Sequence, residues 1–197
     1  TISGKKDPLF ISACPAWIKY AEQFLPEFLP LLSDVKCPQQ ITGSLIKTIV
    51  ADQAGVKPEK IFSVSATPCT AMKFEARRDG MMRRGISDID SVMTIRELGR
   101  LIRLYGIDVT NSDSEQADSP MEGFSSVAAL SEVAGGLAEG IIRSFCHSEY
   151  GKEPDKQHFK KLRTGSSFRE TVIPTGQTEL RVAVVDGLTG LEKLRSS

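Results

Sequence analysis

The sequence predicts an α/β protein built of layered lobes, and two observations carry this prediction. Short apolar, β-prone runs alternate along the chain with segments whose apolar residues recur at helical spacing. Such alternation is typical of small sheets flanked by helices. The segment 108–120 bears on domain organisation, because it is acidic and polar and predicts a surface loop. This loop either divides two lobes or links elements of one domain.

Prolines indicate where the first predicted helix begins and where it ends. A short apolar run over 8–12 predicts a strand, and Pro15 suits the first position of a helix over 15–25. Pro26 and Pro30 then break the chain into short turns, because proline lacks a backbone N–H and clashes inside a helix.

A longer helix is expected over 38–54, with apolar residues on one face and Gly55 at its end. Residues 61–66 form a β-prone run. We interpret the basic stretch 73–85 as a loop or a frayed helix, and the apolar run 89–94 as a buried strand.

Thr94 and Glu97 form a capping box, which predicts that a helix begins next and runs to Tyr105. A long helix is expected over 126–146, where two internal glycines cost about 1 kcal/mol each relative to alanine and indicate close packing. The end of the chain predicts two strands and a last helix, over 167–174, 178–187 and 188–194.

Composition narrows the class of protein. Lys plus Arg and Asp plus Glu both number 25 in 197 residues, so net charge favours neither a nucleic acid nor an anionic membrane as partner. No apolar stretch approaches the roughly 18 residues of a membrane span. The first ten residues lack the apolar core of a signal peptide. We therefore expect a cytoplasmic protein.

The four cysteines lie far apart in the sequence, and no two of them form a CxxC motif. This spacing argues against a disulfide scaffold and against a zinc finger. Two of them have an unusual setting. Cys14 lies between a strand end and a helix that begins with Pro15, and Cys69 follows a β-prone run and Pro68. A thiolate at a helix N-terminus has a lowered pKa and is suited to metal ligation. Two buried structural thiols are the alternative interpretation.

Four segments, read together, resemble the active-site domain of the iron-only (FeFe) hydrogenases: ISACPAWIKYAE, KCPQQITGSLIKT, TPCTAMKFEARR and DIDSVMTIRELGRLI. The resemblance covers nearly the whole chain. It implies layered lobes of short, mainly parallel sheets flanked by helices. It also implies that residues 1–197 are part of the domain that binds the H-cluster.

The resemblance assigns two metal ligands. In this family two cysteines that match Cys14 and Cys69 hold a cubane 4Fe–4S cluster, and a third motif supplies two more cysteines, one of which bridges to a two-iron subcluster. The chain ends before any such motif. We therefore expect the complete H-cluster in a longer parent protein and its absence from this chain alone.

Other positions depart from the family pattern. The family cysteine that relays protons is Ala13, so no catalytic residue is assigned. The motif methionine is Thr67, and the lysine that pairs with a cyanide ligand is Met72. Glu75 matches the family, and Cys37 replaces a serine. The resemblance implies that the cofactor pocket is lined by Ala13, Pro38, Gln39, Thr67, Pro68, Met72 and Ser131.

These departures are similar to those of sensory-type hydrogenases, in which slow hydrogen chemistry informs a signalling module. The partners implied are hydrogen and protons, with ferredoxin-like electron-transfer domains or a signalling domain in the parent. Two alternatives remain: a non-catalytic iron–sulfur assembly or scaffold protein, and an inactive apo-fragment. Because a partial domain leaves apolar surface bare, self-association of the chain is expected.

Overall fold

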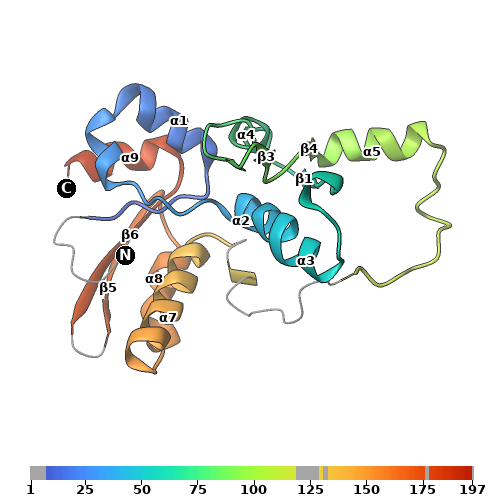
Figure 1. Cartoon of the computed structure of the whole chain (residues 1–197). Helices are drawn as coiled ribbons and strands as arrows, with labels where there is room; N and C mark the ends of the chain where they lie inside the picture. The colour runs from blue at the N-terminus through green and yellow to red at the C-terminus, as the bar shows by residue number, and fades with distance from the viewer. Residues whose placement is uncertain (1–7, 119–128, 131–132, 176–177, 197) are drawn as a thin grey trace. The chain divides into compact units, whose positions relative to one another are not determined.

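The computed structural model describes residues 8–118, 129–130, 133–175 and 178–196. The chain divides into two compact units, Thr1–Met121 and Glu122–Ser197, and each is described by itself (Figure 1). The division point lies just after the acidic segment 108–120.

The first unit contains helices and two short sheets (Figure 1). In chain order its elements are α1 (Pro15–Phe24), the 3₁₀ helix η1 (Pro26–Leu31), α2 (Pro38–Leu45), the π-helical turn η2 (Ile46–Val50), α3 (Ala51–Gln53), the 3₁₀ helix η3 (Pro58–Lys60), β1 (Val64–Thr67), α4 (Ala71–Glu75), β2 (Met82–Arg83), β3 (Ile86–Ser87), β4 (Ser91–Thr94) and α5 (Ile95–Leu104).

Prolines place the helix starts as predicted. Pro15 and Pro38 are the first residues of α1 and α2, where a missing N–H leaves no helical hydrogen bond unmade. The helix expected over 38–54 runs as α2, η2 and α3 without a break. Inside it the Thr48 hydroxyl donates to the Ser44 carbonyl at 2.7 Å. The strand expected over 8–12 is reduced to one bridge, between Phe10 and Leu32.

The parallel pair β1–β4 is the sheet nearest the predicted cysteine site, with Val64 opposite Ser91 and Thr67 opposite Thr94. Helix α5 packs on this pair. The predicted capping box is confirmed, since the Thr94 hydroxyl accepts from the Glu97 N–H at 3.2 Å and the Glu97 carboxylate accepts from the Thr94 N–H at 2.8 Å.

A single carboxylate joins the long helix to the start of both strands. Asp90 Oδ2 accepts from Lys47 Nζ at 2.6 Å, from the Ser63 N–H at 2.6 Å and from the Ser63 hydroxyl at 2.9 Å. Lys47 is buried, so its ammonium depends on this partner and on the Ile61 carbonyl. Burial opposes ionisation of Asp90, but the hydrogen bonds from Lys47 and Ser63 outweigh it and lower the pKa of the carboxyl.

The stretch 73–85 differs in part from the expected loop or frayed helix. Its first residues belong to α4, and its last residues form β2 and the turn to β3, with Arg83 opposite Ile86 in the antiparallel pair. The turn between these strands consists of Arg84 and Gly85, which have φ of +52° and +79°. A two-residue turn of this kind matches the twist of a hairpin, which explains how such a polar sequence forms paired strands.

The second unit contains one β-hairpin with helices beside it (Figure 1). Its elements are α7 (Gly136–Tyr150), the 3₁₀ helix η4 (Lys156–Phe159), α8 (Lys160–Arg163), β5 (Phe168–Pro174), β6 (Glu179–Val185) and α9 (Gly187–Ser196). Strands β5 and β6 are antiparallel, as strands joined by a short turn must be. The core contains Ile142, Cys146, Phe159, Leu162 and Ile173.

The helix predicted over 126–146 is interrupted: residues 129–130 are helical, 133–135 are not, and α7 runs from Gly136 to Tyr150. Residues 126–128 lie outside the described part. Gly135 has a φ of +74° and caps α7, so the glycine pair marks the helix start instead of its interior. Close packing at this pair is confirmed, because a Cβ on Gly135 would collide with the Leu162 carbonyl.

The predicted fold class, small sheets with flanking helices, is confirmed. The expectation that these sheets are mainly parallel is wrong: of the three two-stranded sheets in the described residues, β1–β4 is parallel, whereas β2–β3 and β5–β6 are antiparallel hairpins whose strands follow each other along the chain. Within the same residues, no helix has the length and apolar character needed to cross a membrane.

We predict that Asp90→Asn lowers the free energy of unfolding by about 3 kcal/mol, because the buried Lys47 ammonium loses its charged partner. Urea denaturation checks this. The stabilisation from Asp90 should be present above about pH 4, near the pKa of an unfolded Asp, and be lost as the pH falls further toward the lower folded pKa. Asp113→Asn, on the exposed segment, is the control and should change stability by less than about 0.5 kcal/mol. Equal effects of the two substitutions would contradict the role of Asp90.

Candidate functional site

Cys14 is held immediately before α1. Its backbone is extended, its N–H donates to Ser12 Oγ at 3.0 Å and its carbonyl accepts from the Ile18 N–H at 3.2 Å. The backbone of Cys14 is thereby fixed while its side chain is exposed. The setting matches the helix start predicted for this thiol, whereas the strand predicted before it is reduced to the bridge between Phe10 and Leu32.

Cys69 occupies the turn between β1 and α4. Its N–H donates to Thr67 Oγ1 at 3.3 Å, and its carbonyl accepts from the Met72 N–H at 3.4 Å. Thr67 is buried at the end of β1, so the turn is attached to the sheet. The Cys69 side chain is exposed, like that of Cys14.

Helices α1 and α4, which follow the two cysteines, pack against each other. Lys19 Nζ of α1 lies 4.6 Å from the centre of the Phe74 ring of α4, a cation–π contact. Just beyond α4, the Arg78 guanidinium pairs with the Glu22 carboxylate of α1 at 2.5 Å. Two exposed thiols that are distant in sequence therefore stand at the starts of two packed helices.

The start of α2 joins α4 through a buried thiol–carboxylate pair. The Cys37 thiol donates to Glu75 Oε2 at 2.6 Å, and both side chains are buried. Burial and the Glu75 hydrogen bond raise the pKa of Cys37 to about 11. Cys37 is therefore a neutral thiol at physiological pH and a hydrogen-bond donor. The sequence marks both residues as motif positions without indicating this bond.

Gln39 forms a second link between α2 and the site. Its side-chain amide donates to the Met72 carbonyl at 3.5 Å and its side-chain oxygen accepts from the Ser65 hydroxyl at 2.7 Å. Two predicted pocket residues are thus brought together. Ser65 was missed by sequence reasoning, although its place on β1, two residues before Thr67 and on the same face of the strand, could have indicated it.

The remaining predicted residues are distributed as follows. Ala13 is half-buried beside Cys14, Pro38 is the exposed first residue of α2, and Pro68 is exposed before Cys69. Ser131 lies outside the described residues. The interpretation of Cys14 and Cys69 as buried structural thiols is wrong, since the buried cysteines are Cys37 and Cys146.

The ligands that this site offers a metal are the thiols of Cys14 and Cys69. Over the described ranges, no three His, Cys, Asp or Glu side chains cluster so that they could hold a metal ion. Iron–sulfur clusters are held mostly by cysteine thiolates, typically four. Cys14 and Cys69 fit two of those positions, because both are exposed and each lies just before a helix.

The structure defines an α/β protein of small sheets with flanking helices that carries two exposed thiols before helices, and comparison with known families makes its class specific. The family of the C-terminal domain of the iron-only hydrogenase large subunit matches residues 1–197. The chain belongs to this family.

The relatives of the chain carry names that describe two different functions, hydrogenase and iron–sulfur assembly. The chain is 35% identical over 190 residues to iron hydrogenase 1 of Clostridium pasteurianum, covering 96% of this chain and 33% of that protein. It is 37% identical over 180 residues to the periplasmic [Fe] hydrogenase large subunit of Nitratidesulfovibrio vulgaris, covering 91% and 43%. It is also 32% identical over 197 residues to cytosolic iron-sulfur assembly component 3 of Mus musculus, covering 95% and 40%.

Solved structures agree with the fold. An apo [FeFe]-hydrogenase of Chlamydomonas reinhardtii superposes with a TM-score of 0.76 at 25% identity, over 96% of this chain and 55% of that one. The chain thus spans between a third and somewhat more than half of the length of the relatives named above.

We predict that the Cys37 thiol makes stability fall between about pH 9 and pH 11. The ordinary thiol pKa is 9.0 and the folded value is about 11. Because the folded pKa is the higher one, the stabilisation is complete below the unfolded pKa and is lost as the pH rises through the folded one. Urea denaturation across this range measures it.

Cys37→Ser is the matched control, since a serine hydroxyl can still donate to Glu75 and does not ionise in this range. The wild-type chain should lose stability more steeply than Cys37→Ser above pH 9. Parallel pH profiles of the two proteins would contradict the assigned pKa.

Proposed function

We propose that the chain is the cysteine-bearing part of a sensory-type FeFe hydrogenase, which performs slow hydrogen chemistry and reports hydrogen to a signalling module in a longer protein. The observation that carries the proposal is the pair of exposed thiols, Cys14 and Cys69, at the starts of packed helices with Ala13 beside the first. Family membership supports the hydrogen chemistry, and the altered residues around the thiols support the slow, sensory variant.

Cys14 and Cys69 would hold the 4Fe–4S part of the cofactor as thiolates, with further cysteines supplied from outside this chain. When bound, such a cofactor supplies the site at which hydrogen and protons interconvert with electrons. Gln39, fixed between Ser65 and the Met72 carbonyl, would form one wall of the pocket. Pro38, Thr67 and Pro68 complete the proposed lining from this chain.

The residues around the thiols move protons poorly. The Ala13 methyl neither donates nor accepts a proton, and Met72 carries no charge. Cys37 holds its proton against Glu75, and burial keeps it protonated at physiological pH. We expect slow turnover because these side chains do not transfer protons. A general acid or base positioned at the reacting group contributes about 100- to 10,000-fold to the rate.

A non-catalytic iron–sulfur assembly or scaffold role is the second candidate. It is favoured by the similarity, over 95% of the chain, to the mouse assembly component. Both candidates use the two thiols, but only the first needs a two-iron subcluster. The deciding experiment is an infrared spectrum of the longer parent protein after maturation. Carbon monoxide and cyanide bands support the hydrogenase, whereas iron and sulfide without such bands support the assembly role.

The compartment and the partners belong to the same proposal. We expect electron exchange with ferredoxin-like domains or coupling to a signalling domain of the parent. The relatives named above include one called periplasmic and one called cytosolic. Cytoplasmic location is therefore a prediction that fractionation of the native cells tests.

We predict that Ala13→Cys raises hydrogen evolution by the matured parent protein by about 100-fold or more, because a thiol beside Cys14 restores a proton donor. Hydrogen evolution measured by gas chromatography checks this. Ala16→Cys, on the exposed surface of α1, is the control for adding a thiol and should leave the rate unchanged. An unchanged rate in Ala13→Cys would show that proton delivery at this position is not limiting.

We predict that the isolated 197-residue chain, purified in air, contains no stoichiometric iron, because two thiolate ligands hold a cubane weakly. Cys14 and Cys69 should be alkylated by iodoacetamide in the folded chain, and the buried Cys37 and Cys146 only after denaturation.

The isolated chain should also self-associate, since several large apolar residues on and after α5 are exposed: Ile95, Leu101, Leu104, Tyr105 and Ile107. Sedimentation and iron analysis check both points. A monodisperse monomer with stoichiometric iron and sulfide would contradict them.

A further inference from the structure

The Gln39 side-chain amide is held between two elements of the first unit that follow it at a distance in the sequence. Its oxygen accepts from the Ser65 hydroxyl of β1 at 2.7 Å, and its nitrogen donates to the Met72 carbonyl of α4 at 3.5 Å. The Ser65 contact has the usual length for a hydroxyl donor, whereas the Met72 contact is long and weak. Ser65 is therefore the main restraint on this amide.

The two contacts together fix which way round the amide lies. A backbone carbonyl only accepts hydrogen bonds, so the end of the amide that faces Met72 must be the nitrogen. The oxygen then faces β1, where the Ser65 hydroxyl acts as the donor. The second N–H of Gln39 has no partner among the residues that the structure describes. Gln39 thus keeps one unused hydrogen-bond donor at the end of its amide that faces α4.

Strand β1 connects this amide with the turn that carries Cys69. Ser65 and Thr67 are two positions apart and lie on the same face of the strand. Thr67 Oγ1 accepts from the Cys69 N–H at 3.3 Å. Both strand positions are paired with β4 in parallel register. One face of a sheet strand therefore fixes the Cys69 turn and the orientation of the Gln39 amide.

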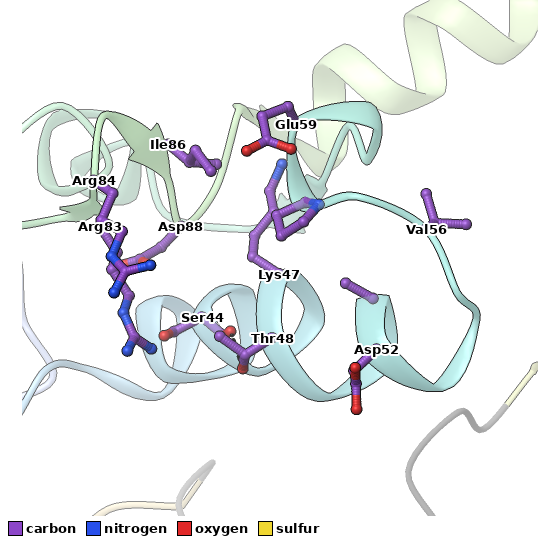
Figure 2. Close-up of a pocket in the computed structure, with 12 residues that line it drawn as sticks. Ser44, Lys47, Thr48, Asp52, Val56, Glu59, Arg83, Arg84, Ile86 and Asp88 are labelled. Atoms are coloured by element: carbon purple, nitrogen blue, oxygen red, sulfur yellow. Dashed lines mark hydrogen bonds between the residues drawn. The ribbon is translucent and has the colours of Figure 1, made fainter.

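A pocket of about 490 Å³ in the first unit is a separate feature, and none of the residues that hold the amide lines it. Figure 2 shows Asp52 and Glu59 on different sides of this pocket, so these carboxylates do not converge on one ligand. Ser44 lines the pocket from the helix that also carries Gln39 (Figure 2). The Ser44 hydroxyl makes no hydrogen bond in the described part of the chain, so Ser44 is a matched control for Ser65.

We propose that Ser65 is a positioning residue of the cofactor site, because it holds the Gln39 amide with its nitrogen toward α4 and leaves one N–H for an acceptor atom of the cofactor. The inference rests on the proposed function, in which Gln39 forms part of the pocket wall. Hydrogen bonds to an iron–sulfur cluster and to its ligands tune the reduction potential. A donor raises this potential, because the reduced state carries more negative charge.

The first test uses the full chain without cofactor, labelled with ¹⁵N in its glutamines. The order parameter of the Gln39 side-chain amide should be near about 0.85 in the wild type and below about 0.6 in Ser65→Ala. Ser65→Thr keeps the hydroxyl and should restore the wild-type value, and Ser44→Ala should not change it. Gln39→Leu identifies the resonance by removing it. An equally rigid amide in Ser65→Ala would overturn the positioning role.

The second test measures the reduction potential of the 4Fe–4S cluster in the matured parent protein, by a redox titration followed with electron paramagnetic resonance. Ser65→Ala should make reduction about tenfold less favourable, a decrease of about 59 mV for one electron. Ser65→Thr and Ser44→Ala should keep the wild-type potential. Gln39→Leu should also lower the potential, and Ser65→Ala should add nothing in that background, because Ser65 acts through Gln39. An unchanged potential in Ser65→Ala, or additive effects of the two substitutions, would overturn the inference.

Failure of this inference and failure of the proposed function give different results. A parent protein without carbon monoxide and cyanide bands contradicts the hydrogenase, but its 4Fe–4S cluster still decides the role of Ser65, since the assembly candidate uses the same two thiols. A parent protein with these bands whose potential does not respond to Ser65→Ala contradicts the inference alone. A parent protein that binds no iron–sulfur cluster would overturn both.

Discussion

The Asp90 carboxylate is the constraint on which the first unit depends. It accepts hydrogen bonds from Lys47 in the long helix and from Ser63 just before β1, and it directly precedes β4. One side chain thus brings together a helix and the starts of two strands that are far apart in sequence. The parallel register of β1 and β4 begins one residue later, at Val64 and Ser91. Strand β1, which begins at Val64, leads to Cys69.

From that sheet the cysteine site is assembled by three helix starts. α1 follows Cys14, α4 follows Cys69, and α2 follows Cys37. The Cys37–Glu75 bond and the Gln39 contacts fix α2 to α4, and Lys19 with Phe74 fixes α1 to α4. In the function that we propose, Cys14 and Cys69 are two ligands whose backbone is positioned before a cofactor binds, which reduces the conformational entropy lost on binding.

Cys14 and Cys69 match the family motif in sequence, whereas several residues near them depart from the family pattern. Both ligand positions are retained, whereas the neighbouring positions that could transfer protons hold a methyl group, a thioether and a thiol that stays protonated. Residues around a cluster tune its potential and the basicity of its ligands. Retained ligands with altered neighbours are the basis on which we favour a sensor over a fast enzyme, and the same pattern leaves the assembly role as its competitor.

The sequence by itself determined the local features. Pro15 and Pro38 place helix starts, Thr94 and Glu97 cap α5, and the spacing of motif residues around Cys14 and Cys69 identifies the family. The helix starts and the cap each depend on residues within a few positions of one another, so local rules suffice for them.

The tertiary structure decided which thiols are exposed, because burial depends on segments that are distant in sequence. It also brought the Cys37 thiol to the Glu75 carboxylate, 38 positions away along the chain. Helix α7 begins at Gly136, where a side-chain Cβ would collide with the Leu130 carbonyl. Contacts of this kind arise only when the chain has folded, and for that reason periodicity and composition did not predict them.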